Sequence, residues 1–137
     1  MQAIPYRIQQ INTLQFAIFP DKFINGEEMS TQAEFHFGYT PQLDSIRCIA
    51  AIEYVQGDTL LLSCKVQCVF EISPEGIEEL KKKMEIPAGF LQYMATIAVG
   101  TTRGIIHSKT EGTLLNAFVL PPLDLTQTID QNLKIEN

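Results

Sequence analysis

The apolar and polar positions of the chain are patterned most clearly in its middle, where residues 46–55 and 59–72 repeat apolar side chains at every second position. This period is typical of β-strands with one buried face, because successive side chains of a strand point to opposite sides. The apolar positions are Ile46, Cys48, Ala50, Ile52 and Tyr54, and then Leu60, Leu62, Cys64, Val66, Cys68, Phe70 and Ile72. We therefore predict two long strands that form a hairpin.

The loop of this hairpin can be predicted from the way its apolar stripes match. A two-residue loop, Gly57 and Asp58, would pair position 52 with Ser63 and so place a polar residue in the apolar stripe. A three-residue loop from Gln56 to Asp58 pairs position 54 with 60 and position 52 with 62, and these residues are all apolar. Because buried faces specify register, we predict the three-residue loop.

Two further strands are predicted before the hairpin. Residues 4–19 alternate in two halves that are out of phase at Gln10–Ile11, which indicates a bulge or bend. Residues 20–32 are polar and typical of a loop, and the alternation then returns. The apolar face of this next strand carries Ala33, Phe35, Phe37 and Tyr39.

Helices are predicted only after the strands. Ser73 and Pro74 indicate a helix start, with the serine as cap and the proline in the first turn, and Pro87 ends this helix. A longer helix is expected from about Ala88 to His107 or Ser108. Residues 113–120 should be extended. Residues 124–135 are either one short amphipathic helix capped by Asp124 or a frayed tail.

This order of elements predicts the fold class. Strands followed by helices indicate an α+β protein, with a four-stranded antiparallel sheet and helices packed on one face. A length of 137 residues fits one domain that spans residues 1–137 and can fold without disulfides or metals.

The charge of the chain limits the partners we expect. Sixteen acidic residues face ten basic ones, giving a net charge of −6. Nucleic-acid binding needs clustered lysine and arginine, so we expect no nucleic-acid partner. No stretch of 18 apolar residues occurs, and we therefore expect no membrane insertion.

The three cysteines bear on the cellular compartment in which we expect the chain. Cys64 and Cys68 lie roughly 13 Å apart along one predicted strand, which is too far for a disulfide. We interpret them, with Cys48, as reduced core residues. The start of the chain lacks the charged residues and apolar run of a signal peptide. Together these features favour a cytosol-like, cytoplasmic location.

Residues that could carry chemistry are not clustered in the sequence. His36 and His107 have no cysteine or acid near them at ligand spacing, so we predict no metal site and no cofactor. The cysteines lie on apolar strand faces, which disfavours a Cys–His nucleophile. We predict that the chain is not an enzyme. A small thioesterase of the hot-dog class remains an alternative, and it would need a carboxylate or histidine at a subunit groove.

Small residues recur every four positions along the long helix, at Thr96, Gly100 and Gly104. Residues at this spacing share one helix face, and their small size lets a second backbone approach closely. We predict that this strip packs the helix against the sheet or contacts a second subunit.

Four segments carry a family resemblance when they are taken in order: "YRIQQINTLQFAIF", "LLSCKVQCVFEI", "IPAGFLQYMATIAVGTTRGII" and "LNAFVLPPLDL". The first is similar to the opening strand of the SecB family of export chaperones, and the second to the family's C-x-V-Q strand. The third stands at the place of the family's long helix after a proline. The fourth is similar to its extended, leucine-rich segment before the last helix.

The resemblance implies a chaperone of the holdase type that works without ATP, metal or an active site. It implies binding of unfolded polypeptide in apolar surface grooves and self-association into a dimer or tetramer. Carried over by position, Phe35 and Phe37 fall on the family's groove wall, and Leu125 and Ile129 fall on the last helix, which covers the groove. The alternative is that Phe35 and Phe37 belong simply to the sheet core.

The chain also departs from the family pattern. The acidic positions through which the family contacts the export motor SecA are matched here by Gln15, Phe19 and Lys65, which makes docking to this motor doubtful. A role in protein export therefore stays open beside two others. These are a SecB-like chaperone that accompanies a toxin–antitoxin pair, and a non-catalytic assembly or scaffold protein.

Overall fold

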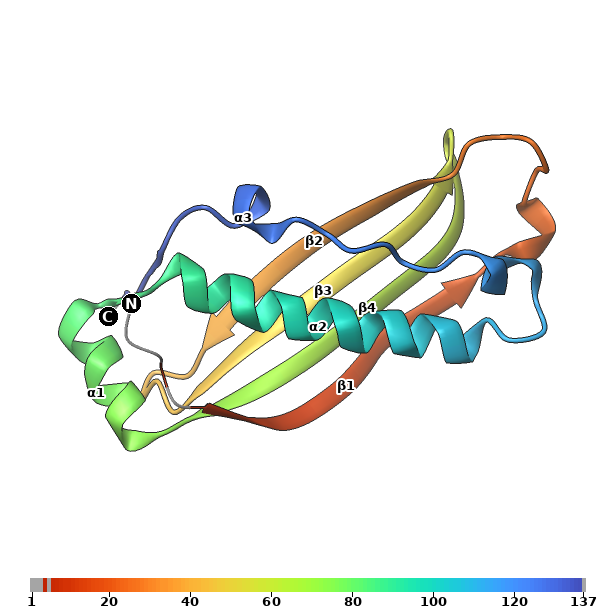
Figure 1. Cartoon of the computed structure of the whole chain (residues 1–137). Coiled ribbons are helices and arrows are strands. Elements are labelled where there is room, and N and C mark those ends of the chain that lie inside the picture. Colours follow the sequence, from red (N-terminus) through yellow and green to blue (C-terminus); the bar gives the residue numbers. More distant parts are fainter. Residues whose placement is uncertain (1–3, 5, 137) are drawn as a thin grey trace.

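The main element of the structure, a computed structural model that describes residue 4 and residues 6–136, is a four-stranded antiparallel sheet with the order β1-β4-β3-β2 (Figure 1). Its strands are β1 (Tyr6–Ile18), β2 (Ser30–Tyr39), β3 (Ser45–Gln56) and β4 (Thr59–Ile72). The remaining elements are η1 (Pro20–Lys22), α1 (Pro74–Lys83), β5 (Glu85–Ile86), α2 (Ala88–Lys109), η2 (Leu114–Ala117), α3 (Leu125–Thr128) and β6 (Leu133–Lys134).

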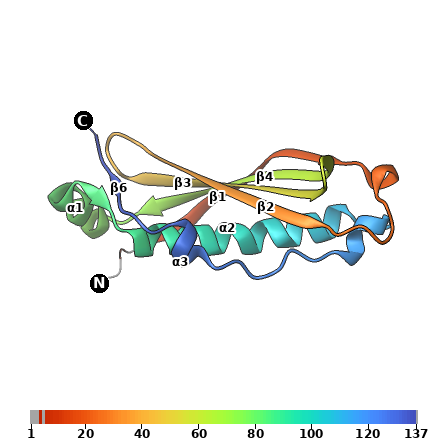
Figure 2. The same cartoon turned by 90° about the horizontal axis from the view of Figure 1, so that it is seen from above.

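The predicted fold class is confirmed. The strands come first along the chain, and α2, α3 and the segment that joins them lie on one side of the sheet (Figure 2). The helix α2 runs across the two central strands, β3 and β4. Such a layer arrangement buries one face of an antiparallel sheet and one stripe of a helix against each other.

The core lies between α2 and the central strands. Every second side chain from Ile46 to Tyr54 on β3, and from Leu62 to Phe70 on β4, is almost fully enclosed. The buried residues of α2 are Phe90, Leu91, Met94, Ala95, Ala98, Val99, Thr102 and Ile106. The alternation along the sequence thus predicted the buried face of both strands, and the three cysteines lie in this core as expected.

The loop of the β3–β4 hairpin differs from the prediction. Gln56 pairs with Thr59, so the loop consists of two residues, Gly57 and Asp58. Gly57 has a φ of +57°, a value that favours glycine and that tight two-residue hairpin turns require. The local preference of this turn therefore decides the loop length.

A bulge restores the match between the apolar stripes of this hairpin. The register shifts by one residue beside Tyr54, and Leu61 is the extra residue on β4. Beyond the bulge Ile52 pairs with Cys64, not with Leu62 as predicted. The predicted register is therefore wrong, although the requirement behind it, apolar residues opposite apolar ones, is met.

The irregularity predicted in the first strand is confirmed. The pairing of β1 with β4 shifts between Ile8 and Gln10, next to the expected position, and shifts again between Thr13 and Gln15. The stretch from Gln10 to Thr13 pairs without interruption. Bulges of this kind increase the local twist of an edge strand.

Caps explain where the helices begin. Ser73 caps α1 as predicted, since its hydroxyl oxygen accepts a hydrogen bond of 3.2 Å from the amide of Gly76. The first residue before α2 is Pro87, which offers no side-chain cap. Instead the side-chain oxygen of Asn132 accepts a hydrogen bond of 2.8 Å from the amide of Ala88. The end of the chain thus caps the start of the long helix.

The C-terminal part matches neither predicted alternative in full, because only one helical turn forms and the chain after it is ordered. A single helical turn, α3, is capped by Asp124, whose carboxylate accepts a 3.1 Å hydrogen bond from the amide of Thr126. The chain then continues to β6, which pairs with β5. Residues 113–120 are extended only in part, because η2 forms within them.

Candidate functional site

The segment that runs back alongside α2 forms the candidate site (Figure 1). We call residues 118–129 the strap. It leaves η2, runs back along α2 and ends just after α3 (Figures 1 and 2). Three of its side chains are buried, with exposed fractions of 1% for Leu120, 6% for Leu125 and 8% for Ile129, whereas Val119 between them and η2 is 63% exposed. The strap therefore attaches by separate apolar anchors.

Side chains of α2 hold the strap by its backbone. Arg103 donates from Nε to the carbonyl oxygen of Leu120 at 2.6 Å, and from Nη2 to the carbonyl oxygen of Pro121 at 3.0 Å. Three helical turns earlier, Nε2 of Gln92 donates to the carbonyl oxygen of Ile129 at 2.7 Å. All three acceptors are groups that every polypeptide carries, so these contacts recognise an extended chain and not its sequence.

The middle of the strap has little other support. Within the part of the chain that the structure describes, residues 119–123 make no backbone–backbone hydrogen bond. Pro121 and Pro122 have no amide proton to donate. At its start the strap is fixed by Phe118, whose ring lies 5.4 Å from that of Phe23. Few backbone hydrogen bonds and isolated anchors are typical of segments that open locally at low free energy.

Two adjoining hollows open between α2 and the strap. One of about 220 Å³ is lined by residues that include Val99, Arg103 and Pro122, and the other, of about 370 Å³, extends past Gly89 and Tyr93. Thr96, Leu123 and Leu125 line both. The two hollows together form a groove of mixed apolar and polar character beside the strap.

No family model and no curated protein matches this sequence. Among solved structures, the SecB-like chaperone Rv1957 of Mycobacterium tuberculosis, in complex with a ChAD peptide from the antitoxin HigA1 (Rv1956), matches with a TM-score of 0.53. The match covers 86% of this chain and 90% of that one at 12% sequence identity. The fold is similar to that of a SecB-like chaperone. At this identity the likeness shows the fold and nothing finer.

Within this SecB-like fold the predicted groove residues do not form an open groove. Phe35 and Phe37 pair with Ala50 and Cys48, so they lie on the helix side of the sheet, and both are half-buried against the core. Leu125 and Ile129 are anchors of the strap itself, and both side chains are buried. Their role as a client groove stays a prediction, and in this conformation the chain's own strap covers this part of the fold.

The strip of small residues lies on the outside of α2. Thr96, Gly100 and Gly104 are all exposed, and a Cβ atom placed on either glycine meets no atom within 4 Å. Packing of the strip against the sheet is therefore wrong, because the larger apolar residues of α2 take that side. Contact with a second subunit stays a prediction. Thr96 also lines the hollows beside the strap.

Sequence reasoning missed Gln92 and Arg103, which in the apolar pattern of the helix are only interruptions. Their separation of eleven residues, close to three turns of 3.6 residues, places them on one side of α2. That spacing was a usable signal. The groups that accept their hydrogen bonds gave no signal in the sequence, because backbone carbonyl oxygens occur at every position.

Burial raises the pKa of several titratable groups in the core. It raises the pKa of the Cys48 thiol to about 12 and that of Cys64 to about 11. A raised pKa keeps both thiols protonated and poorly nucleophilic. Burial also raises the pKa of Tyr54, and the nearby charge of Arg103 opposes this shift. The Tyr54 hydroxyl has no hydrogen-bond partner among the described residues.

The histidines and acidic side chains are dispersed over the molecule. Across residues 4 and 6–136, no three or more histidine, cysteine or acidic side chains gather as metal ligands would. His36 is exposed on β2 beside Glu34, with 3.6 Å between Nε2 and Oε2, and His107 is exposed near the end of α2. None of the helices that the structure describes has the length and apolar character needed to cross a membrane.

Proposed function

We propose that this chain is an ATP-independent chaperone that holds unfolded polypeptides on the surface of α2 and β2 that the strap covers. One observation supports this most directly. The helix α2 already holds an extended apolar segment, the strap, through three backbone carbonyls and three buried side chains. An unfolded client offers the same two features, carbonyl oxygens and scattered apolar residues.

The energetics of such binding require no sequence code. Burying one leucine or isoleucine side chain contributes about 1.5–3 kcal/mol, so three anchors supply most of the attraction. Arg103 and Gln92 then orient the backbone by hydrogen bonds to its carbonyls. Hydrogen bonds from a charged donor such as Arg103 are the stronger kind. A client with apolar residues four or five positions apart could replace the strap.

Displacement of the strap would join the predicted groove residues to this surface. Phe35 and Phe37 lie on the same side of the sheet as the strap, and Leu125 is one of its anchors. In the client-bound form we expect the two phenylalanines to contact client side chains. The structural neighbour supports polypeptide binding in general, since that chaperone is in complex with a peptide.

The function is tested by mixing the purified chain with an unfolded model protein without nucleotide and following light scattering. We expect suppression of aggregation near one-to-one stoichiometry. No suppression, together with no binding to reduced unfolded chains, would contradict the proposal.

The surface is tested by tying the strap down. Thr96 and Leu123 line the same hollows, so a disulfide between Thr96→Cys and Leu123→Cys would tie the strap to α2. We expect the oxidised variant to lose client binding and the reduced variant to regain it. Each single cysteine variant is the control. Full activity of the oxidised form would place the client elsewhere.

A further inference from the structure

The long helix and the sheet beneath it present no acidic side chain toward the strap. No acidic residue occurs between Glu85 and Glu111, a stretch that includes the whole of α2. The acidic residues of β2, β3 and β4, which are Glu34, Glu53 and Glu71, alternate with more buried residues and lie on the other face of the sheet. Sixteen acidic residues outnumber ten basic ones in the whole chain, so this surface differs in charge from the rest of the molecule.

Arg103 is a cation without an anionic partner on this surface. None of the ion pairs in the part of the chain that the structure describes includes it. Arg103 is half-buried, and its guanidinium donates to the neutral carbonyl oxygens of Leu120 and Pro121. It also lines the hollow of about 220 Å³ together with Pro122. Arginine binds a carboxylate through two parallel hydrogen bonds that are stronger than bonds to neutral oxygens, so a carboxylate would stabilise this charge better than the strap does.

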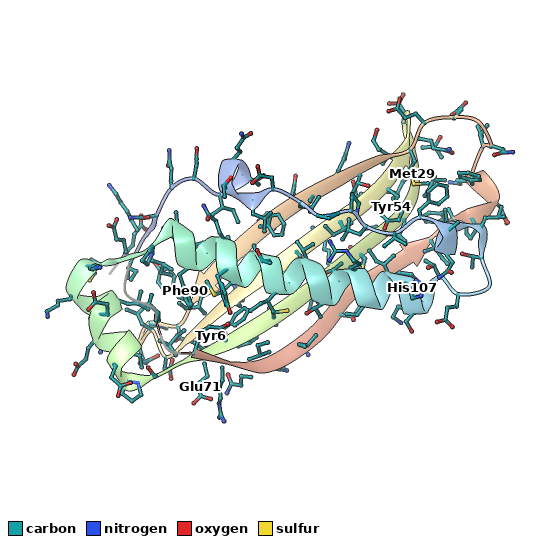
Figure 3. The ribbon with its side chains drawn as sticks, viewed as in Figure 1. Tyr6, Met29, Tyr54, Glu71, Phe90 and His107 are labelled. Carbon is teal, nitrogen blue, oxygen red and sulfur yellow. The ribbon has the colours of Figure 1, made fainter. Side chains whose placement is uncertain are left out.

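Tyr54 brings an unsatisfied hydroxyl to the same region. Its side chain is 1% exposed, and the hydroxyl has no hydrogen-bond partner among the described residues. Burial raises the pKa of Tyr54 and the charge of Arg103 lowers it, so the two side chains are within electrostatic reach of each other. Figure 3 shows Tyr54 in the half of the molecule where α2 ends near His107. An unpaired buried hydroxyl costs free energy that a phenylalanine would avoid, and we therefore expect Tyr54 to have a partner in another state of the chain.

We propose that Arg103 and Tyr54 together bind a carboxylate of the client, so that the chain prefers unfolded segments with an acidic residue beside their apolar anchors. This specificity rests on the proposed chaperone function. Displacement of the strap removes the carbonyl oxygens of Leu120 and Pro121 from Arg103, and it removes the Leu120 side chain from the buried cluster that contains Tyr54. Two donors of the guanidinium and one hydroxyl are then available to the client.

The carboxylate would give a client an advantage over the strap. A neutral client offers Arg103 the same carbonyl oxygens that the strap already offers. An acidic client replaces two neutral acceptors by one charged acceptor whose geometry matches the guanidinium. The acidic residue of the strap itself, Asp124, is engaged elsewhere, because its carboxylate accepts hydrogen bonds from the amide of Thr126 at 3.1 Å and from its hydroxyl at 2.6 Å.

Two peptides with the sequence of the strap, residues 118–129, test the preference. One carries Pro122→Glu and the other Pro122→Gln, because Pro122 lines the hollow beside Arg103. Both also carry Asp124→Asn and an amidated C-terminus, so the glutamate supplies the only carboxylate. We expect the glutamate peptide to bind the native chain about tenfold more tightly by fluorescence anisotropy, and the difference to shrink at high salt.

Variants of the chain assign this difference to the two side chains. Arg103→Gln should abolish it, and Tyr54→Phe should reduce it to about threefold while leaving the melting temperature unchanged or higher. Lys65→Gln is the matched control, because it removes the same charge from an exposed position on the outer face of β4, and it should keep the full difference. Comparing the two peptides on one variant cancels any loosening of the strap.

Three results would overturn the inference. These are equal binding of both peptides to the native chain, a difference that survives Arg103→Gln, and no binding of either peptide to a chain that suppresses aggregation. A lower melting temperature of Tyr54→Phe would show that the hydroxyl already has a partner, which overturns the role of Tyr54. Each of these results leaves the proposed chaperone function standing, whereas a native chain that fails to suppress aggregation contradicts that function itself.

Discussion

The two sides of α2 hold their neighbours in different ways. Toward the sheet, α2 buries a continuous face of apolar side chains against β3 and β4. Toward the strap, it holds three separate apolar anchors and gives hydrogen bonds to backbone carbonyls. The first interface is specific to this sequence and should be permanent. The second could hold many different segments, so it should be exchangeable.

The largest expected effect comes from truncating a core side chain, and comparing it with truncation of a strap anchor distinguishes the two interfaces of α2. Phe70 is fully enclosed in the sheet layer, and Phe70→Ala should lower the free energy of unfolding by about 3–5 kcal/mol. Leu120→Ala removes a strap anchor and should lower it by less, because the strap can open while the sheet stays folded. Chemical denaturation of both variants measures this difference. Equal losses would show that strap and core unfold as one unit.

Alkaline pH should lower the free energy of unfolding, because Cys48 is buried between α2 and the sheet with a raised pKa. Cys48 has a pKa of about 12 in the folded chain and an ordinary value of 9 when unfolded. The unfolded chain therefore loses this proton first, and stability falls as pH rises from about 9 to 12. The loss is at most about 1.4 kcal/mol per pH unit for this thiol. Denaturation midpoints of the native chain and Cys48→Ala should converge as pH rises; parallel curves would contradict the shift.

Arg103→Ala should loosen the strap side alone. It removes two hydrogen bonds to carbonyl oxygens, each worth about 1.5–3 kcal/mol when the donor is charged. We expect faster amide hydrogen exchange at Phe118, Thr126 and Ile129, whose amides donate hydrogen bonds in the strap, and unchanged exchange in β3 and β4. Arg103→Lys, which keeps the charge but loses the fork of donors, should give an intermediate result. Uniform acceleration across the sheet would remove the distinction between the two interfaces.

Gly104 gives the smallest effect and tests the outer strip. Nothing lies within 4 Å of a Cβ placed there, so Gly104→Ala should stabilise the lone chain by about 0.5–1 kcal/mol. Gly104→Leu should weaken assembly by about 1–3 kcal/mol where a second subunit packs on this strip. Thermal melting measures the stability of the chain, and light scattering measures its assembly. Unchanged assembly would leave the strip without a partner.

The sheet could be predicted because each of its strands carries a repeated signal. Alternation of period two identified the buried faces of β3 and β4, and Ser73 with Pro74 marked the start of α1. The register of the hairpin could not be predicted, because the preference of Gly57 for a positive φ and the bulge at Leu61 act together. Neither is visible in the pattern of apolar residues.

The candidate site was much less predictable. The strap anchors Leu120, Leu125 and Ile129 are five and four positions apart, which follows no single secondary-structure period. The contacts of Gln92 and Arg103 end on carbonyl oxygens, which have no sequence signature. The strip of small residues on α2 indicated close packing but could not indicate on which side of the helix. Placing these residues required the path of the chain after α2.

Both ends of the strap are tied to the body of the protein. At its start the ring of Phe118 packs against that of Phe23, and after its end Asn132 binds the start of α2 while β6 pairs with β5. A displaced strap therefore stays nearby as a tethered competitor, at an effective concentration on the order of millimolar. Under the proposed function, this competition would make every client bind more weakly than its contacts alone allow. It would also let the chain release a client without nucleotide hydrolysis.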